Sequence, residues 1–318
     1  MNVLLVLAYN EELNIEKTLQ SNIGLFDKII VVNDKSKDST QVILENFIKN
    51  TSKIEIILNR KNYGPGKSMN VGLKESKKYN PNFIVKIDGD NQFKHEDIKS
   101  LLEMGIINNS DFIKCDRFWD KGIEGKIPKI RYFGNAFATL LIRAVTGNWK
   151  ITDPLNGLFL FSGKMASSIE IPRFFNRYGY PFYINLSISK LSIKTSVKIH
   201  QFRNTIVYAN ETSRLSPLGV FFKLIIYSFY YFSKTIKTKL RYSNYQISGL
   251  IDVSALIAFL TSIMSLYMFI VSRFFSYQGN QNTWFLLMIL FFITFVVLMM
   301  QSPKAMGDRN EDNFKYLN

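Results

Sequence analysis

The sequence predicts an α/β fold: a mostly parallel, Rossmann-like sheet domain followed by amphipathic interfacial helices and a hairpin of two transmembrane helices. Three observations predict this class. Short apolar runs alternate with helical stripes over the first half of the chain, polar residues follow the ends of several runs, and apolar residues accumulate after residue 250. Strands and helices that alternate at this spacing are typical of β–α–β units.

Six apolar runs have the composition of strands that are buried on both faces. They are residues 3–8, 28–32, 54–58, 83–87, 112–115 and 158–161. Residues 193–199 are expected to form an edge strand with outward-facing lysines. The helices between the first four strands have the following expected inward-facing residues: Leu13, Ile15 and Leu19; Val42, Ile43, Phe47 and Ile48; Met69, Val71 and Leu73.

One of these strands ends in two carboxylates. Phe83, Val85 and Ile87 alternate as in a buried strand, and Asp88-Gly89-Asp90 follows. Gly89 permits a turn that brings the two carboxylates together. Such a pair repels itself unless a cation lies between the two groups, and Mg²⁺ or Mn²⁺ prefers these hard oxygen ligands. A polar turn that only ends the strand is the alternative.

Other polar side chains are expected at the same edge of the sheet. Asn10 and Glu11 follow the first strand, and Asn33 and Asp34 follow the second. In parallel sheets, ligands bind at the carboxyl ends of the strands. The convergence of these residues with Asp88 and Asp90 favours a ligand-binding site.

Composition limits the function classes. The 318 residues include 40 Lys and Arg against 25 Asp and Glu, a formal net charge of +15, which favours anionic lipid, phosphorylated substrates or nucleic acid. The sequence has no motif of a nucleic-acid-binding domain, so no nucleic acid is expected as a partner. Cys115 is the single cysteine, which excludes an internal disulfide or a structural zinc cluster. The N-terminus resembles a strand and not a signal peptide.

The last third of the sequence predicts membrane attachment. Residues 218–231 are apolar and aromatic, and four basic residues between Lys234 and Arg241 follow, as in a helix that lies on anionic headgroups. Residues 250–272 and 284–301 are apolar enough to cross a hydrocarbon layer of about 30 Å. Asp252 lies near the end of the first span, where it is expected to reach water.

The charge distribution predicts the orientation of these spans. Lysine and arginine flank the hairpin on the side of both termini, whereas the connecting loop carries Arg273 alone. The positive-inside rule therefore predicts an integral protein of the cytoplasmic membrane with its large domain and both termini in the cytosol. The expected division is a cytosolic domain (1–213), juxtamembrane helices (214–245), two spans (246–303) and a cytosolic tail (304–318).

Five motifs in order resemble family 2 glycosyltransferases, in particular the dolichol-phosphate mannose synthase-like and bacterial polyprenyl-phosphate enzymes. They are Tyr9-Asn10-Glu11-Glu12, residues 31–40, Asn62-Tyr63-Gly64, Asn70-Val71-Gly72-Leu73 and Asp88-Gly89-Asp90-Asn91-Gln92. The resemblance covers residues 1–162 and implies a GT-A domain with a divalent metal and inversion at the anomeric carbon. It is also consistent with a homo-oligomer packed through its spans.

The resemblance also implies roles for individual residues. Metal and diphosphate would be held by Asp88, Asp90 and Gln92. The remaining donor-site candidates, for a UDP- or GDP-linked sugar, are Ala8, Tyr9, Asn10, Glu11, Asn33, Asp34, Gly64, Lys67 and Gly89. The acceptor phosphate of a polyprenyl lipid would be held by Arg117, Arg131, Asn135 and Arg214. Asp90 and Asp153 are the catalytic candidates, and Asp153 either orients the sugar or accepts a proton.

Three departures from the family pattern stand out. Ala8 replaces a proline, Asn33-Asp34 replaces a pair of aspartates, and residues 208–215 only approximate the basic acceptor motif. The leading hypothesis is transfer of a hexose to a lipid phosphate, and two alternative functions remain. One is transfer to a glycan or another lipid acceptor, and the other is a membrane-anchored scaffold that binds sugar nucleotides without catalysis.

Overall fold

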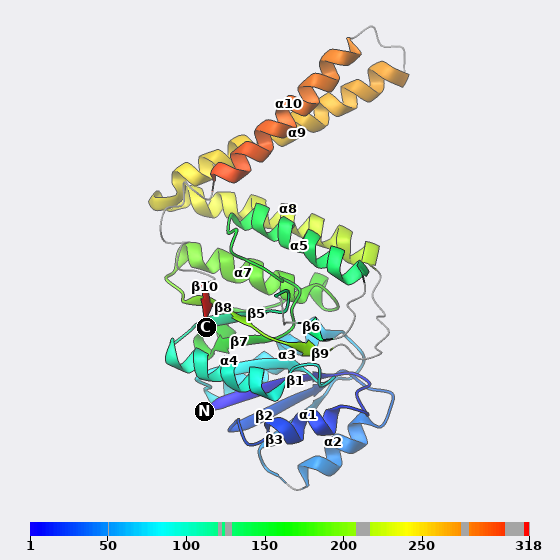
Figure 1. Ribbon diagram of the computed structural model, residues 1–318, viewed down its shortest axis with the longest axis vertical. Helices are drawn as coiled ribbons and strands as arrows, with labels where there is room; N and C mark the ends of the chain where they lie inside the picture. Colours follow the sequence, from blue (N-terminus) through cyan, green and yellow to red (C-terminus); the bar gives the residue numbers. More distant parts are fainter. Residues whose placement is uncertain are drawn as a thin grey trace. The chain divides into compact units, whose positions relative to one another are not determined.

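A computed structural model describes residues 1–49, 51–119, 123–124, 129–207, 217–274, 280–302 and 315–317 of the chain (Figure 1). The chain divides into two compact units. Unit 1 comprises Met1–Leu140, Lys150–Ile226 and Asp312–Asn318, and unit 2 comprises Leu141–Trp149 and Tyr227–Glu311. Unit 1 contains the sheet, whereas unit 2 contains the two most apolar helices.

The described residues of unit 1 form an eight-stranded sheet in the order β10-β8-β5-β7-β4-β1-β2-β3. Its strands are β1 (Asn2–Ala8), β2 (Lys28–Asn33), β3 (Ile54–Leu58), β4 (Phe83–Asp88), β5 (Phe112–Asp116), β7 (Phe159–Ser162), β8 (Ile199–Arg203) and β10 (Lys315–Leu317). β7 is antiparallel to β4 and β5, and the other pairings in this sheet are parallel. β6 (Ile123–Glu124) and β9 (Ile206–Val207) form a separate parallel pair. The predicted mostly parallel α/β sheet is confirmed.

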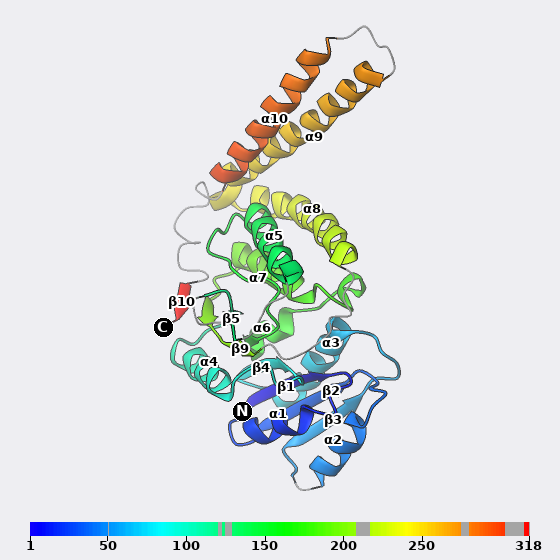
Figure 2. The same ribbon diagram turned by 45° about the vertical axis from the view of Figure 1, so that its right-hand side comes forward.

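Helices cover both faces of this sheet, because its inner strands are apolar on both faces (Figures 1 and 2). The core of one face joins Leu4, Val6 and Val85 to residues of α1 (Ile15–Asn22), α2 (Thr40–Ile48) and α4 (His95–Ile107). On the opposite face α3 (Pro65–Ser76) packs against Leu5. The remaining α-helices are α5 (Lys129–Thr146), α6 (Gly163–Ser168), α7 (Tyr180–Lys194), α8 (Pro217–Arg241), α9 (Gln246–Phe274) and α10 (Gln281–Gln301), and 3₁₀ turns occur at Lys77–Tyr79, Arg173–Phe175 and Ser243–Tyr245.

Some local predictions are wrong. Residues 193 and 194 end α7, and β8 starts at Ile199 with a partner strand on each side, so residues 193–199 are not an edge strand. Leu13 is 90 % exposed because α1 begins only at Ile15. In α2 the inward position belongs to Leu44, whereas Val42 and Ile48 are exposed.

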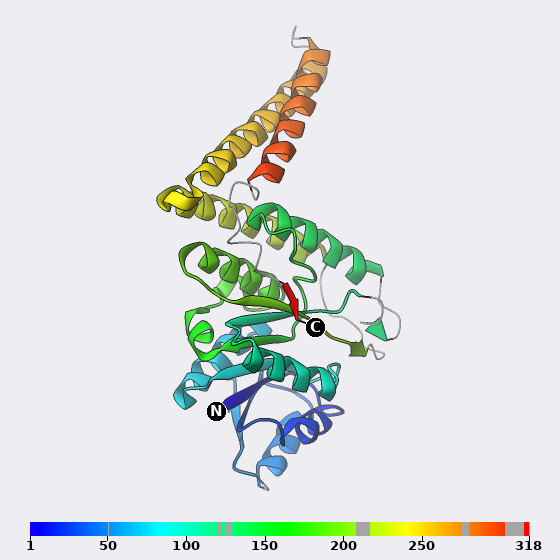
Figure 3. The ribbon, with the colours of Figure 1, turned by 60° about the vertical axis from the view of Figure 1, so that its left-hand side comes forward.

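The sheet of unit 1 also includes residues that follow the apolar helices in sequence. β10 lies beside β8, with Tyr316 opposite Gln201, and is the red strand near the C-terminus in Figure 3. Residues 315–317 of the expected tail are therefore part of the sheet.

In unit 2, α9 and α10 pack against each other as a hairpin (Figures 1–3). The hydroxyl of Ser262 donates a hydrogen bond to the carbonyl of Met288 at 3.0 Å, which fixes one level of the packing. Outward-facing residues such as Leu260, Met264 and Leu290 are more than half exposed. Both helices are long and apolar enough to cross a membrane. Asp252 does not reach water: it is buried and lies 2.6 Å from the ammonium of Lys239.

Candidate active site

Backbone hydrogen bonds hold the carboxyl ends of β1, β2 and β4 together. The amide of Asp34 donates to the carbonyl of Ala8 at 2.9 Å, and the amide of Gly89 donates to the carbonyl of Leu7 at 2.9 Å. The loops that follow the three strands therefore begin side by side. The structure brings together the segments that carry the predicted donor residues.

The side chains of the first two loops mostly bind one another. The Asn10 carboxamide oxygen accepts from the Lys37 amide at 2.8 Å, and the Asn33 oxygen accepts from the Ser36 amide at 2.9 Å. The amide of Glu11 donates to the Thr40 hydroxyl at 2.8 Å. Asn10 has a left-handed backbone (φ 59°), which asparagine tolerates well. These polar residues shape the loops, and Tyr9 is half-buried beside them.

Asp34 organises a third loop, which leads from β3 to α3. Its buried carboxylate accepts hydrogen bonds from the Asn59 side chain at 2.7 Å, from the Tyr63 amide at 3.0 Å and from the Gly64 amide at 2.7 Å. Gly64 needs to be glycine because its φ is +99° and a Cβ there would lie 2.6 Å from the carbonyl oxygen of Asn176.

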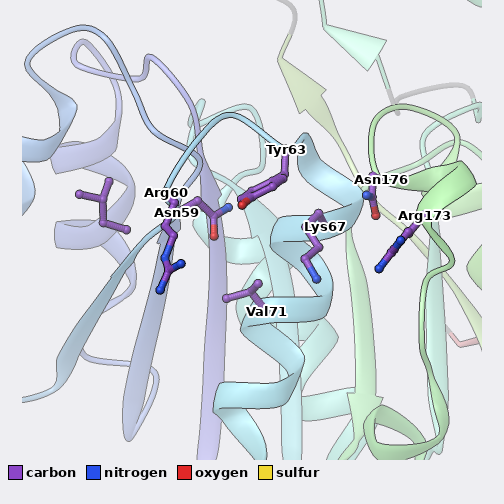
Figure 4. A pocket seen from close by; sticks show the side chains of 8 residues that line it. Asn59, Arg60, Tyr63, Lys67, Val71, Arg173 and Asn176 are labelled. Carbon is purple, nitrogen blue, oxygen red and sulfur yellow. The ribbon is translucent and has the colours of Figure 1, made fainter.

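A basic pocket of about 410 Å³ adjoins this loop. Figure 4 shows Arg60 on one side of α3 and Arg173 on the other, with Lys67 on the helix between them. Asn59, Tyr63 and Asn176 also line the pocket. Two of the lining residues, Asn59 and Tyr63, also donate hydrogen bonds to Asp34, the predicted nucleoside-binding residue. The three basic side chains of the pocket suit an anionic ligand.

The Asp-Gly-Asp turn has a partner that the sequence analysis did not identify. Lys86, fully buried on β4, donates hydrogen bonds to Asp88 at 2.7 Å and to the Gly157 carbonyl at 2.9 Å. Burial opposes the charge of this ammonium, but Asp88 and the neighbouring Tyr180 outweigh it and raise the pKa of Lys86. Lys86 thus ties the strand of Asp88 to the loop of Asp153. The sequence did contain a signal for this role of Lys86. It is a lysine within an otherwise apolar strand, two residues before Asp88.

The predicted metal ligands lie at the end of β4 and in the turn that follows it. Asp88 keeps 35 % of its side chain exposed, Asp90 accepts a hydrogen bond from the Gln92 amide at 3.2 Å, and Gln92 is largely buried. Across the described part of the chain, no group of three or more His, Cys, Asp or Glu could hold a metal ion. Two carboxylates and one carboxamide nevertheless fit Mg²⁺, which commonly binds one or two carboxylates and completes its coordination with phosphate and water.

Asp153 and Arg117, predicted for different roles, form an ion pair. An Nη of Arg117 donates to Asp153 Oδ1 at 3.2 Å, the Nε lies 3.1 Å from Oδ2, and the Arg117 amide also donates to Oδ2. Asp153 is buried and has a left-handed backbone with φ 37°. Burial raises the pKa of Asp153, although Arg117 and Lys114 act in the opposite direction. The pair joins the end of β5 to the loop that precedes β7.

A second contact joins the same two segments. The hydroxyl of Thr152 donates to Asp116 at 2.9 Å, one residue before Asp153 on one segment and one before Arg117 on the other. Tyr316 of β10 donates to the same carboxylate oxygen. Burial opposes the charge of Asp116, but Lys114 and these donors lower its pKa.

One row of residues runs across the sheet beneath both predicted subsites. Tyr316 lies opposite Gln201, Gln201 opposite Lys114, Lys114 opposite Phe159, and Phe159 opposite Lys86. Lys86 and Lys114 are both fully buried, and each precedes an aspartate by two residues, at Asp88 and Asp116. Two buried lysines therefore lie on one face of the sheet, each two residues before a carboxylate of the site.

The other predicted acceptor residues lie on α5. Arg131 and Asn135 are one helical turn apart, so they share a face. The buried carboxamide oxygen of Asn135 has no hydrogen-bond partner among the described residues, which makes it available to a ligand. Rotation of the Asn135 carboxamide by half a turn would place its NH₂ group, a hydrogen-bond donor, where the oxygen now lies. Arg214 lies outside the described residues.

Comparison with known proteins identifies the class of enzyme. The model of the family described as glycosyl transferase family 2 matches residues 3–168, more than half of the chain. The chain belongs to this family. The matched segment contains Asp34, Asp88, Asp90, Arg117 and Asp153.

Three curated relatives share this region. The chain is 28 % identical over 177 residues to UDP-N-acetylglucosamine–dolichyl-phosphate N-acetylglucosaminyltransferase of Methanococcus voltae (50 % of this chain, 68 % of the relative). It is 26 % identical over 176 residues to dolichyl-phosphate β-glucosyltransferase ALG5C of Trichomonas vaginalis (50 % and 51 %). It is also 36 % identical over 141 residues to the uncharacterized protein MJ0544 of Methanocaldococcus jannaschii (44 % and 59 %). The matches thus span between half and about two thirds of these relatives.

Among solved structures, TarS of S. aureus is similar with a TM-score of 0.50 and 16 % sequence identity, over 98 % of this chain and 54 % of TarS. A likeness at this identity concerns the fold alone. It agrees with the predicted GT-A type of sheet.

Proposed function

We propose that this protein transfers a hexose from a nucleotide-diphosphate sugar to a polyprenyl phosphate at the cytosolic face of a membrane. The observation that carries the proposal is the joining of two carboxylate sites within one family 2 sheet domain. Lys86 connects Asp88 to the loop of Asp153, and Asp153 binds Arg117. Two of the relatives are named for transfer to dolichyl phosphate, which supports a lipid phosphate as the acceptor.

The reaction is a single displacement in this proposal. An oxygen of the lipid phosphate forms a bond to the anomeric carbon while the bond from that carbon to the diphosphate breaks, so the configuration inverts. The lipid phosphate is already ionised at neutral pH and needs little help from a base. Asp153, tied to Arg117 and buried, serves to orient the sugar and the arginine.

The reaction also requires stabilisation of the negative charge that develops on the leaving diphosphate. Mg²⁺ or Mn²⁺ held by Asp88, Asp90 and Gln92 would neutralise that charge. Lys86 holds Asp88 in place from below the site. On the acceptor side, Arg117 presents a planar guanidinium that Asp153 orients, and such a group suits a phosphate better than the ammonium of lysine.

The apolar helices support membrane attachment. α9 and α10 are long and apolar enough to span, and α5 and α8 expose Phe133 and Phe222. Such surfaces would keep the domain next to an acceptor that is dissolved in the bilayer.

The test is to incubate membranes containing the protein with labelled UDP- and GDP-linked sugars, with or without polyprenyl phosphate. We expect release of nucleoside diphosphate and label in the lipid only when lipid phosphate and a divalent metal are both present. The Asp90→Ala variant serves as the inactive control. Equal turnover of the sugar nucleotide without lipid would overturn the proposal.

A further inference from the structure

The strongest feature outside the motifs is the C-terminal strand. β10 pairs with β8 so that Tyr316 lies opposite Gln201, at the level of Lys114. Strand alternation directs Tyr316 to the face that also carries Lys86 and Lys114. Leu317 points to the opposite face, where it packs against the core.

Tyr316 contacts a carboxylate whose other bonds shape the site. Asp116 is 3 % exposed and its Oδ1 accepts from the Phe118 amide at 2.9 Å. Its Oδ2 accepts from both Thr152 and Tyr316, and the hydroxyls of Thr152 and Tyr316 are themselves 2.9 Å apart. An ionised carboxylate accepts only, so three donors converge on this one group.

Two parallel links therefore join the same two segments. The Asp116–Thr152 contact is next to the Arg117–Asp153 ion pair in sequence on both segments. Movement of Asp116 must move Arg117, and movement of Thr152 must move Asp153, because the residues are adjacent. Tyr316 donates a hydrogen bond to Asp116 and so stabilises the Asp116–Thr152 contact. The Arg203 guanidinium lies 4.9 Å from the centre of the Tyr316 ring.

We infer that Tyr316 is a positioning residue for the acceptor side of the site, and that the C-terminal strand is needed to align Arg117 with Asp153. This inference rests on the proposed function for the meaning of "acceptor side". The placement of Tyr316 does not depend on it. The C-terminal segment is thus part of the catalytic unit, although it follows both apolar helices in the chain.

The kinetic experiment uses the full-length protein in lipid nanodiscs with the Tyr316→Phe variant. This change removes one hydroxyl and keeps the ring against Arg203. We expect kcat/KM for polyprenyl phosphate to fall about tenfold, as for loss of a hydrogen bond to a charged group, with KM for the nucleotide sugar unchanged and the Tm lowered by only a few degrees. Lys315→Gln, an exposed neighbour on β10, should match the wild type in all three quantities.

A second readout is independent of catalysis. The indole N–H of Trp119, three residues after Asp116, donates to the Asn204 carbonyl at 2.9 Å. In a background with Trp149→Phe and Trp284→Phe, Trp119 is the single tryptophan. We expect Tyr316→Phe to increase its quenching by acrylamide, because the loop after β5 loosens.

The possible outcomes distinguish failure of the proposed function from failure of the positioning role of Tyr316. If the wild type transfers no sugar to lipid phosphate, the proposed function fails, and the Trp119 readout still decides the role of Tyr316. Wild-type quenching in Tyr316→Phe overturns the inference. So does an equal loss for donor and acceptor accompanied by a much lower Tm, because that pattern indicates only a general packing role.

Discussion

At the scale of single residues, Lys86 shows how the site depends on a group that has no place in a motif. A buried ammonium is costly unless it is paired. The ammonium of Lys86 is stabilised by hydrogen bonds to Asp88 and to the Gly157 carbonyl, and by the face of the Tyr180 ring, whose centre lies 5.4 Å away. The result is a fixed spacing between two loops that must both meet the substrate.

Gly157 provides a direct test of that spacing. A Cβ at this position would lie 2.7 Å from Asp88 Oδ2 and 3.2 Å from Lys86 Nζ. We expect Gly157→Ala to displace Asp88 and to weaken Mn²⁺ binding at least tenfold, measured by electron paramagnetic resonance with the nucleotide sugar present. Gly24→Ala is the matched control, since nothing lies within 4 Å of its added carbon. Unchanged Mn²⁺ affinity in Gly157→Ala would mean that Asp88 is not a ligand.

At the scale of elements, the sequence predicted strands well where both faces are apolar. Residues 3–8 and residues 83–87, which are apolar except for Lys86, match β1 and β4 because a short apolar run is typical of a strand in a parallel sheet that is covered on both faces. β8 reads Ile-His-Gln-Phe-Arg, and its buried Gln201 accepts from the distant Thr152 amide and donates to the Lys150 carbonyl. Such long-range bonds leave no local pattern.

The candidate site shows the same limit. Asp34, Asp88 and Asp153 could be predicted as candidates because each lies at the end of an apolar run or in a loop next to one. β10 has three residues, and its partner β8 lies more than a hundred residues earlier. Neither its pairing nor the contact of Tyr316 with Asp116 could be predicted from periodicity.

α5 and α8 each present an exposed apolar face. Ile130, Phe133 and Leu140 are exposed on α5, and Phe222 and Ile226 are exposed on α8. The rings of Phe137 and Phe221 contact each other in a tilted arrangement with centroids 4.5 Å apart. Removing one such aromatic side chain from water is worth about 1.5–3 kcal/mol. We therefore predict that both faces insert into lipid.

A fluorescent label can measure this insertion. In nanodiscs, a bimane probe on Phe133→Cys or Phe222→Cys, in a Cys115→Ser background, should be quenched by brominated lipids. The control is Ile107→Cys, since Ile107 is equally apolar and 75 % exposed but lies at the end of α4. Equal quenching at all three positions, or at none, would contradict the prediction.

The start of the hairpin holds a buried ion pair. The ammonium of Lys239 on α8 lies 2.6 Å from Asp252 on α9 and donates to the Ser302 hydroxyl at 3.2 Å, with both charged side chains 2 % exposed. Removal of one partner leaves an uncompensated buried charge, which typically costs about 3–5 kcal/mol. We expect Lys239→Met and Asp252→Leu each to destabilise the protein strongly.

The double variant should recover most of that loss, because no charge then remains buried. Unfolding in detergent, followed by circular dichroism for the four members of the cycle, measures the coupling. Additive losses would show that the two residues act independently. Ser254→Ala, an exposed position on the same helix, controls for general effects of substitution in α9.

At the scale of the whole molecule, the sheet constrains the proposed path of the chain through a membrane. β8 precedes α9 and α10, β10 follows them, and the two strands are paired in one unit. If the apolar helices cross a bilayer, the chain segments on either side of the hairpin must lie on the same side of it, so the number of crossings must be even. Two spans satisfy this condition, whereas a single span does not.

This argument predicts the accessibility of single cysteines in sealed right-side-out vesicles, again with Cys115→Ser. Asn280→Cys, at the start of α10, should react with a membrane-impermeant maleimide from outside. Lys198→Cys before β8 and Lys315→Cys on β10 should react only after the vesicles are opened, because the excess of basic residues around the hairpin ends favours the cytosol. Labelling of Lys315→Cys from outside would show that the strand pairing and the membrane path are incompatible. Labelling of all three positions only after opening would show that the two apolar helices do not cross.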